Sequence, residues 1–92
     1  TKVRPAVVVS SALYQTTEPD LLLVALTSKV DTATGPLQYA IRDWQAAGLR
    51  RPTALKPALF TLDPAQVLHR VGGLTSADMT QVDRRLRLAL GL

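Results

Sequence analysis

Residues 21–28 have the sequence LLLVALTS, a nearly continuous apolar run that follows a segment rich in turn-forming residues, 12–20. A short apolar run bounded by turn residues predicts a strand in the interior of a sheet. Upstream, residues 4–11 (RPAVVVSS) place three consecutive valines after a proline that suits the first position of a strand. They predict a second buried strand, joined to the first by a turn.

The segment after the central run predicts further short strands. Residues 37–42 alternate apolar and polar side chains, which is typical of a half-buried strand close to a sheet edge. Residues 43–52 predict a loop or helical turn closed by Gly48, and short strands are expected near 53–56 and 60–63.

The C-terminal part predicts a helix. Thr75 and Asp78 have the spacing of a capping box, and apolar residues then recur every three or four positions, at Met79, Val82, Leu86 and Ala89. Before it, Pro64 with Asp63 as cap suits the start of another helix, but residues 67–72 hold β-branched side chains and end at paired glycines. A strand is the preferred interpretation of residues 67–72.

Short strands followed by one terminal helix predict a mainly β domain, a small barrel or curled antiparallel sheet with a C-terminal α-helix packed on it. The chain of 92 residues is 47% hydrophobic and 20% charged, which favours one folded domain over residues 1–92 rather than a disordered chain. So short a chain buries a small core, so a dimer partner would add stability.

The composition excludes most familiar enzyme classes. The chain has no cysteine, one histidine and one glutamate, and no metalloprotease, phosphate-loop, nucleophile-elbow or dinucleotide motif. The absence of cysteine favours a reducing compartment, the cytoplasm, and no apolar run approaches the length of a membrane span. His69, which follows Leu68, is expected at the surface rather than in a catalytic site.

Lys and Arg number 11 against 7 Asp and Glu, and eight of the 11 are Arg, whose planar fork matches phosphate geometry. This balance suits a polyanionic partner, although a charge of +4 serves solubility equally well. Tyr39 and Trp44 could stack on RNA bases, but a core or interface anchor is favoured for Trp44. The arginines late in the helix, Arg84, Arg85 and Arg87, are better explained by the helix dipole than by phosphate binding.

Four stretches together resemble the MazF/PemK family of toxins in order and distance: residues 3–9 (VRPAVVV), 24–28 (VALTS), 43–52 (DWQAAGLRRP) and 60–63 (FTLD). The spacing between Arg4 and Thr27 matches the spacing expected for the family's catalytic arginine and threonine. Family members begin with a further strand that holds a Gly-Asp pair, so the resemblance implies that this chain is N-terminally incomplete.

The resemblance implies an SH3-like barrel that dimerises and cuts single-stranded messenger RNA at short preferred sequences without a metal or other cofactor. It also implies a cognate antitoxin whose tail occupies the RNA groove. Arg4 and Thr27 are the expected catalytic residues, with Arg4 stabilising charge on the phosphate. The expected substrate-binding residues are Lys2, Ser10, Ser28, Lys29 and Lys56, the last replacing a polar side chain that some relatives carry where Ala58 stands here.

Two alternatives stay open from the sequence. The first is a toxin of the same fold that inhibits a protein such as gyrase through its C-terminal helix, in which Leu86 and Leu90 would matter. The second is an inactive relative that only binds RNA or an antitoxin.

Overall fold

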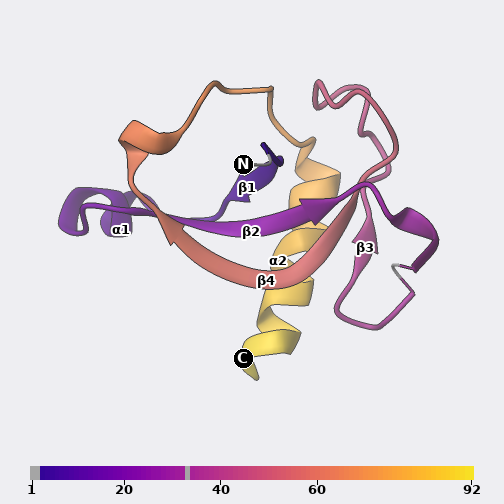
Figure 1. Ribbon diagram of the computed structural model, residues 1–92. Helices are drawn as coiled ribbons and strands as arrows, with labels where there is room; N and C mark the ends of the chain where they lie inside the picture. The colour runs from indigo at the N-terminus through magenta and orange to yellow at the C-terminus, as the bar shows by residue number, and fades with distance from the viewer. Residues whose placement is uncertain (1–2, 33) are drawn as a thin grey trace.

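The computed structural model describes residues 3–32 and 34–92, which form a curled sheet with a long helix behind it (Figure 1). The elements, in chain order, are β1 (Ala6–Val8), α1 (Ala12–Thr17), β2 (Leu21–Thr27), η1 (Val30–Thr32), β3 (Tyr39–Ala40), β4 (Ala54–Leu62), η2 (Pro64–Gln66) and α2 (Ser76–Leu90).

The four strands form one antiparallel sheet in the order β1-β2-β4-β3. The prediction of an interior strand at residues 21–28 is confirmed, because β2 pairs on both sides. A register shift between Val24 and Leu26 in the β2–β4 pair marks a bulge, and bulges bend and twist the strand that carries them. The predicted fold, a curled antiparallel sheet with a C-terminal helix, is confirmed.

One face of the sheet carries the core. Val24, Leu55 and Val82 of β2, β4 and α2 are completely or almost completely buried, at 0%, 1% and 0% exposure, in one apolar cluster. Figure 1 shows α2 crossing behind the sheet on this side. The helix begins at its cap Thr75 and ends before Gly91, whose left-handed conformation is typical of a helix C-terminus. The predicted C-terminal helix is therefore confirmed.

The first strand differs from the prediction, because β1 lies at a sheet edge rather than in a buried position. Of its residues only Val7 is buried, while Val8 is 44% exposed. Three valines in a row favour a strand but do not say which positions face a neighbour. The prediction that residues 37–42 lie near an edge is confirmed, because β3 is the other edge strand.

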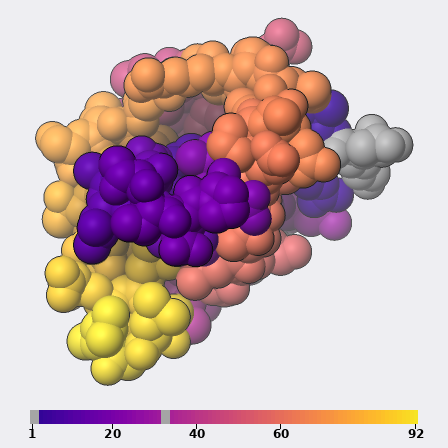
Figure 2. Space-filling model, turned by 90° about the vertical axis from the view of Figure 1, so that its left-hand side faces the viewer, coloured from indigo at the N-terminus to yellow at the C-terminus, as the bar shows by residue number. Residues whose placement is uncertain are grey.

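The turn expected between the first two strands contains a short helix, α1, which the sequence reasoning missed. The side chain of Ser11 caps it by accepting a hydrogen bond from the backbone N–H of Tyr14 at 3.1 Å. None of its residues is buried, and in the space-filling view it projects from the surface above the end of α2 (Figure 2). Such a helix lacks the apolar face that periodicity detects.

Two other predictions need correction. Residues 67–72 form no strand; instead η2, capped by Asp63, is followed by an extended segment that arches over the sheet toward α2. The β-branched residues there have no strand beside them, and Val67 and Val71 are 42% and 46% exposed. The strands expected near 53–56 and 60–63 are the two ends of one strand, β4. No helix in the described part of the chain has the length and apolar character needed to cross a membrane.

Candidate functional site

The structure brings Arg4 and Thr27 together at one end of the sheet. In the β1–β2 pair, Ala6 lies opposite Ala25, and the backbone N–H of Leu26 donates to the Pro5 carbonyl at 3.3 Å. The Pro5–Leu26 bond continues this register by one residue beyond Ala6 and Ala25. One residue further along each strand, Arg4 lies opposite Thr27. Residues directly opposite in an antiparallel pair project to the same face of the sheet. Two residues far apart in the sequence thus share one rim.

The hydroxyl of Thr27 is oriented by its own backbone turn. The backbone N–H of Lys29 donates to this hydroxyl oxygen at 3.2 Å. That contact uses an acceptor lone pair and leaves the O–H hydrogen of Thr27 without an acceptor among the described residues. The side chain is half-buried and β-branched, so few rotamers are open to it. It can therefore donate to an oxygen atom placed on this rim.

The guanidinium of Arg4 is available for a ligand. Arg4 is exposed, and within residues 3–32 and 34–92 it has no hydrogen-bond or ion-pair partner. A guanidinium presents five N–H donors in a planar fork, which matches two oxygens of a phosphate. The same described residues contain no cluster of three or more His, Asp or Glu side chains that could hold a metal ion.

The structure places some of the other expected substrate-binding residues at the rim and others away from it. Ser28 and Lys29 directly follow β2 and are exposed at the same rim as Thr27. Lys56 is exposed on β4, two positions after Ala54, which is the partner of Thr27, and it lies in the bulge where three residues of β4 face one residue of β2.

Ser10 does not belong to this group, and Lys2 lies outside the described residues. Ser10 follows the far end of β1, and its hydroxyl accepts from the Leu22 backbone N–H at 2.9 Å and donates to the Leu22 carbonyl at 3.3 Å. These bonds tie β1 to β2 at the opposite end of the sheet from Arg4. The structure gives Ser10 a role in strand pairing and no position at the rim.

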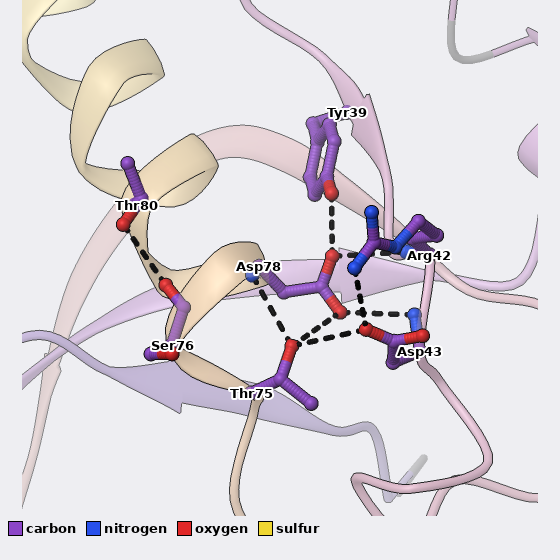
Figure 3. Close-up of polar contacts among 7 residues, drawn as sticks. All are labelled: Tyr39, Arg42, Asp43, Thr75, Ser76, Asp78 and Thr80. Carbon is purple, nitrogen blue, oxygen red and sulfur yellow. Dashed lines mark hydrogen bonds and ion pairs between the residues drawn. The ribbon is translucent and has the colours of Figure 1, made fainter.

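A buried polar cluster lies behind the rim, around Asp78 in the first turn of α2 (Figure 3). Its carboxylate accepts backbone N–H bonds from Arg42 at 3.0 Å and Asp43 at 2.9 Å, and a bond from the Tyr39 phenol. Thr75 donates its hydroxyl to the same group at 3.2 Å. Since Arg42 and Asp43 follow β3, the cluster fastens the start of α2 to the end of the sheet that carries Thr27.

This cluster shifts two pKa values. Burial away from water raises the pKa of the Asp78 carboxyl, but hydrogen bonds from Tyr39, Asp43, Arg42 and Thr75 lower it by more, so the pKa lies below its usual value. Burial and the hydrogen bond to Asp78 both raise the pKa of the Tyr39 phenol. Asp78 is therefore a charged acceptor held in place and not a proton donor at neutral pH.

The aromatic residues take structural positions. Trp44 and Tyr39 are half-buried and pack against the core cluster, as favoured for Trp44 from the sequence. The guanidinium carbon of Arg85 lies 4.8 Å from the centre of the Tyr39 ring, a cation–π contact.

The structure gives one late arginine of α2 an ion-pair partner and places the single histidine at the surface. Arg87 pairs with Asp83 at 3.1 Å, one turn earlier in the helix, so its charge is used within α2. His69 is exposed on the segment that arches over the sheet, consistent with the expected surface position.

The sequence reasoning missed the part played by Asp78 beyond its capping box. Spacing identified Thr75 and Asp78 as the start of a helix but contained no signal for the partners across the molecule. The only local hint was an acidic residue next to apolar Met79 and Val82 on the core-facing side of the helix.

A family model described as "PemK-like, MazF-like toxin of type II toxin-antitoxin system" matches residues 1–90. The chain belongs to this family. The MazF/PemK resemblance in the sequence is thereby confirmed over nearly the whole chain. A search of curated protein sequences gave no significant match.

Three solved structures of similar fold come from mycobacteria. An endoribonuclease from a mycobacterial species superposes with a TM-score of 0.80 at 25% identity, over 97% of this chain and 81% of that one. An endoribonuclease in complex with its cognate antitoxin gives 0.78 at 23% identity, over 97% and 79%. The Mycobacterium tuberculosis toxin MazF-mt6 gives 0.75 at 14% identity, over 97% and 87%. The last two support the MazF-like fold alone.

Proposed function

We propose that this chain is the toxin of a type II toxin-antitoxin pair and acts as a metal-independent, sequence-specific endoribonuclease on single-stranded messenger RNA. The observation that carries the proposal is the position of Arg4 opposite Thr27 on one rim, in a chain of the MazF-like toxin family. The similar mycobacterial structure at 25% identity is named an endoribonuclease, which supports the same activity.

The reaction is an attack of the ribose 2′-oxygen on the adjacent phosphorus. A bond forms between the 2′-oxygen and phosphorus while the bond to the 5′-oxygen breaks, leaving a 2′,3′-cyclic phosphate and a 5′-hydroxyl end. The non-bridging oxygens gain negative charge on the way, and donors already aimed at them lower the barrier most. Arg4, exposed and without a protein partner among the described residues, supplies these donors.

Proton transfer restricts what each residue does. The 2′-hydroxyl loses a proton and the 5′-oxygen gains one, but arginine stays protonated near neutral pH and is a poor base. We therefore assign Arg4 to charge stabilisation, with N–H hydrogen bonds to the phosphate and the leaving oxygen, while solvent water accepts the 2′-hydroxyl proton and supplies the proton that the 5′-oxygen gains. Thr27 holds a non-bridging oxygen through its free O–H, with Ser28, Lys29 and Lys56 binding the RNA around it.

The charge of the same rim also indicates the chemistry of its binding partners. A positively charged rim attracts RNA and also suits the acidic tail of an antitoxin, which would block the site by covering it. One similar structure contains an endoribonuclease bound to its cognate antitoxin, which supports such a partner. We also propose that the toxin is a homodimer and acts in the cytoplasm, where its messenger RNA substrate is found.

The experiment that tests this function is cleavage of a defined single-stranded RNA library in EDTA. The proposal predicts cuts at a short common sequence, 2′,3′-cyclic phosphate and 5′-hydroxyl ends, and no loss of rate when divalent metal is removed. Cleavage that requires metal, or that yields 3′-hydroxyl and 5′-phosphate ends, would contradict it.

The competing protein-binding mode makes a different prediction about growth arrest. In that mode, toxicity survives Arg4→Ala and is lost on changing the helix surface. Leu90 suits this test because it is 59% exposed, whereas Leu86 packs against the core and its replacement would also destabilise the fold. The ribonuclease proposal predicts the reverse: Arg4→Ala abolishes toxicity and Leu90→Ser retains it.

A further inference from the structure

Four strand termini meet at the end of the sheet that holds Thr27. At this end β1 and β4 begin and β2 and β3 finish, as the antiparallel registers require. Thr27 lies opposite Ala54, and Ala54 lies opposite Ala40. In Figure 1 the arrowhead of β2, the start of β4 and β3 all lie on the right-hand side, below the segment that precedes β4. That segment carries Arg50 and Arg51.

Arg50 and Arg51 are exposed, and neither has a hydrogen-bond or ion-pair partner in the part of the chain that the structure describes. Other arginines are engaged: Arg42 pairs with Asp43 at 3.3 Å, Arg70 donates to a backbone carbonyl, and Arg85 and Arg87 have partners on α2. Four arginines have no hydrogen-bond or ion-pair partner within the described residues: Arg4, Arg50, Arg51 and Arg84. Three of these four lie at or next to one end of the sheet.

The backbone beneath the two arginines is fixed although their side chains are free. The Thr53 hydroxyl donates to the Arg51 carbonyl at 2.9 Å, and the Ile41 backbone N–H donates to the Thr53 carbonyl at 2.9 Å. On the other side, the Leu49 backbone N–H donates to the Trp44 carbonyl at 3.1 Å. A fixed backbone with unpaired cationic side chains is suited to an anionic ligand, because binding the ligand orders little additional backbone.

The separation from Thr27 determines which phosphate these arginines could reach. Three residues span at most about 11 Å between the Cα atoms of Arg51 and Ala54, and neighbouring strands put Ala54 about 5 Å from Thr27. This upper limit of about 16 Å puts the two arginines within reach of a phosphate next to the linkage that Arg4 and Thr27 hold.

We propose that Arg50 and Arg51 bind a phosphate adjacent to the scissile one in single-stranded RNA, which extends the substrate site along the rim beyond Arg4 and Thr27. The inference rests on the proposed ribonuclease function. The two arginines set affinity and orientation and take no part in bond breaking. They are positioning residues, and short substrates that lack the neighbouring phosphate do not use them.

The test compares the double variant Arg50→Ala/Arg51→Ala with Arg84→Ala, which removes an exposed, unpaired arginine from α2. Binding is measured with an RNA whose 2′-hydroxyl at the cut site is replaced by hydrogen, at 50 and 200 mM salt. Each phosphate contact on a single strand contributes about 0.7 to the salt slope, so losing the contact with the adjacent phosphate lowers the slope by about 0.7. The double variant should bind about tenfold more weakly at 200 mM and about 25-fold more weakly at 50 mM.

Two further measurements separate positioning from a structural role. A variant with lysine at both positions keeps the charge and should recover most of the salt slope, and kcat of the double alanine variant on long RNA should stay within about twofold of wild type. On a dinucleotide substrate, wild type and double variant should cleave with equal kcat/KM.

A loss of binding free energy in Arg84→Ala at least half as large as that in the double variant would overturn the inference, because each arginine would then act only through its net charge. Unchanged binding in the double variant, while wild type still cleaves RNA, would overturn it and leave the ribonuclease function standing. A wild-type protein that neither binds nor cuts RNA would overturn both.

Discussion

The phenol of Tyr39 donates a hydrogen bond to the carboxylate of Asp78, which joins the edge strand β3 to the first turn of α2. Asp78 is completely buried, and its remaining capacity is filled by backbone N–H groups of the turn after β3 and by its cap partner Thr75. A buried carboxylate is tolerated only when it is satisfied in this way. This contact therefore holds α2 against the end of the sheet that carries the proposed site.

Replacing Asp78 with alanine should lower the free energy of unfolding by about 3 kcal/mol or more, because several buried donors lose their acceptor at once. Urea denaturation measures the change. Asp83→Ala is the matched control: it removes an exposed acid from the same helix and should cost less than about 1 kcal/mol. Similar losses in the two variants would show that the cluster contributes no special stability.

Acid should destabilise the protein through the same carboxyl. The folded pKa of Asp78 lies below its unfolded value, so its contribution to stability is complete above the ordinary carboxyl pKa of about 4 and is lost as pH falls below it. The free energy of unfolding, measured from pH 7 down to pH 3, should fall less steeply in Asp78→Asn than in wild type. Parallel pH curves for the two proteins would contradict this explanation.

A close approach of two backbone segments requires glycine at position 72. A Cβ atom there would lie 2.2 Å from the carbonyl oxygen of Ala47, and the facing residue Gly48 has a φ of +86°. Gly72→Ala should therefore cost about 1–3 kcal/mol of unfolding free energy. Gly73→Ala is the control, since its nearest atom would be the flexible end of Arg70 at 3.7 Å. Equal stability of the two variants would show that the segments can separate without cost.

The sequence predicted those parts of the fold whose cause is local. The apolar run of β2 and the capping box with apolar spacing of α2 each specify an element with little help from the rest of the chain. The strand predicted at 67–72 was wrong because a strand also needs a free edge to pair with, which β-branched residues do not reveal. The helix α1 was missed because it buries nothing.

The candidate site was predictable only in part, for a similar reason. Arg4 and Thr27 were chosen through family resemblance, and the antiparallel register of β1 and β2 explains why residues so far apart are neighbours. The position of Ser10 could not be judged from its proximity to Arg4 in the sequence, because a strand carries nearby residues to opposite ends of a sheet. The partners of Asp78 come from β3 and the following turn, which no local pattern connects with α2.

The Thr27 hydroxyl offers a test of the proposed phosphate contact. Thr27→Val keeps the shape and removes the donor, so kcat should fall by about 10²-fold while the fold is kept. Thr27→Ser restores a hydroxyl and should recover most of that loss. Single-turnover cleavage of a defined RNA gives both values. Equal rates for the valine and serine variants would remove Thr27 from the mechanism.

The most direct test of the central claim is the single-turnover cleavage rate of Arg4→Ala on a defined RNA in EDTA, beside Arg84→Ala as a control of equal charge change. The account predicts a loss of at least about 10²-fold for Arg4→Ala, with an unchanged circular dichroism spectrum, and less than about threefold for Arg84→Ala. Cleavage by Arg4→Ala at the wild-type rate would contradict the assignment of this rim as the catalytic site.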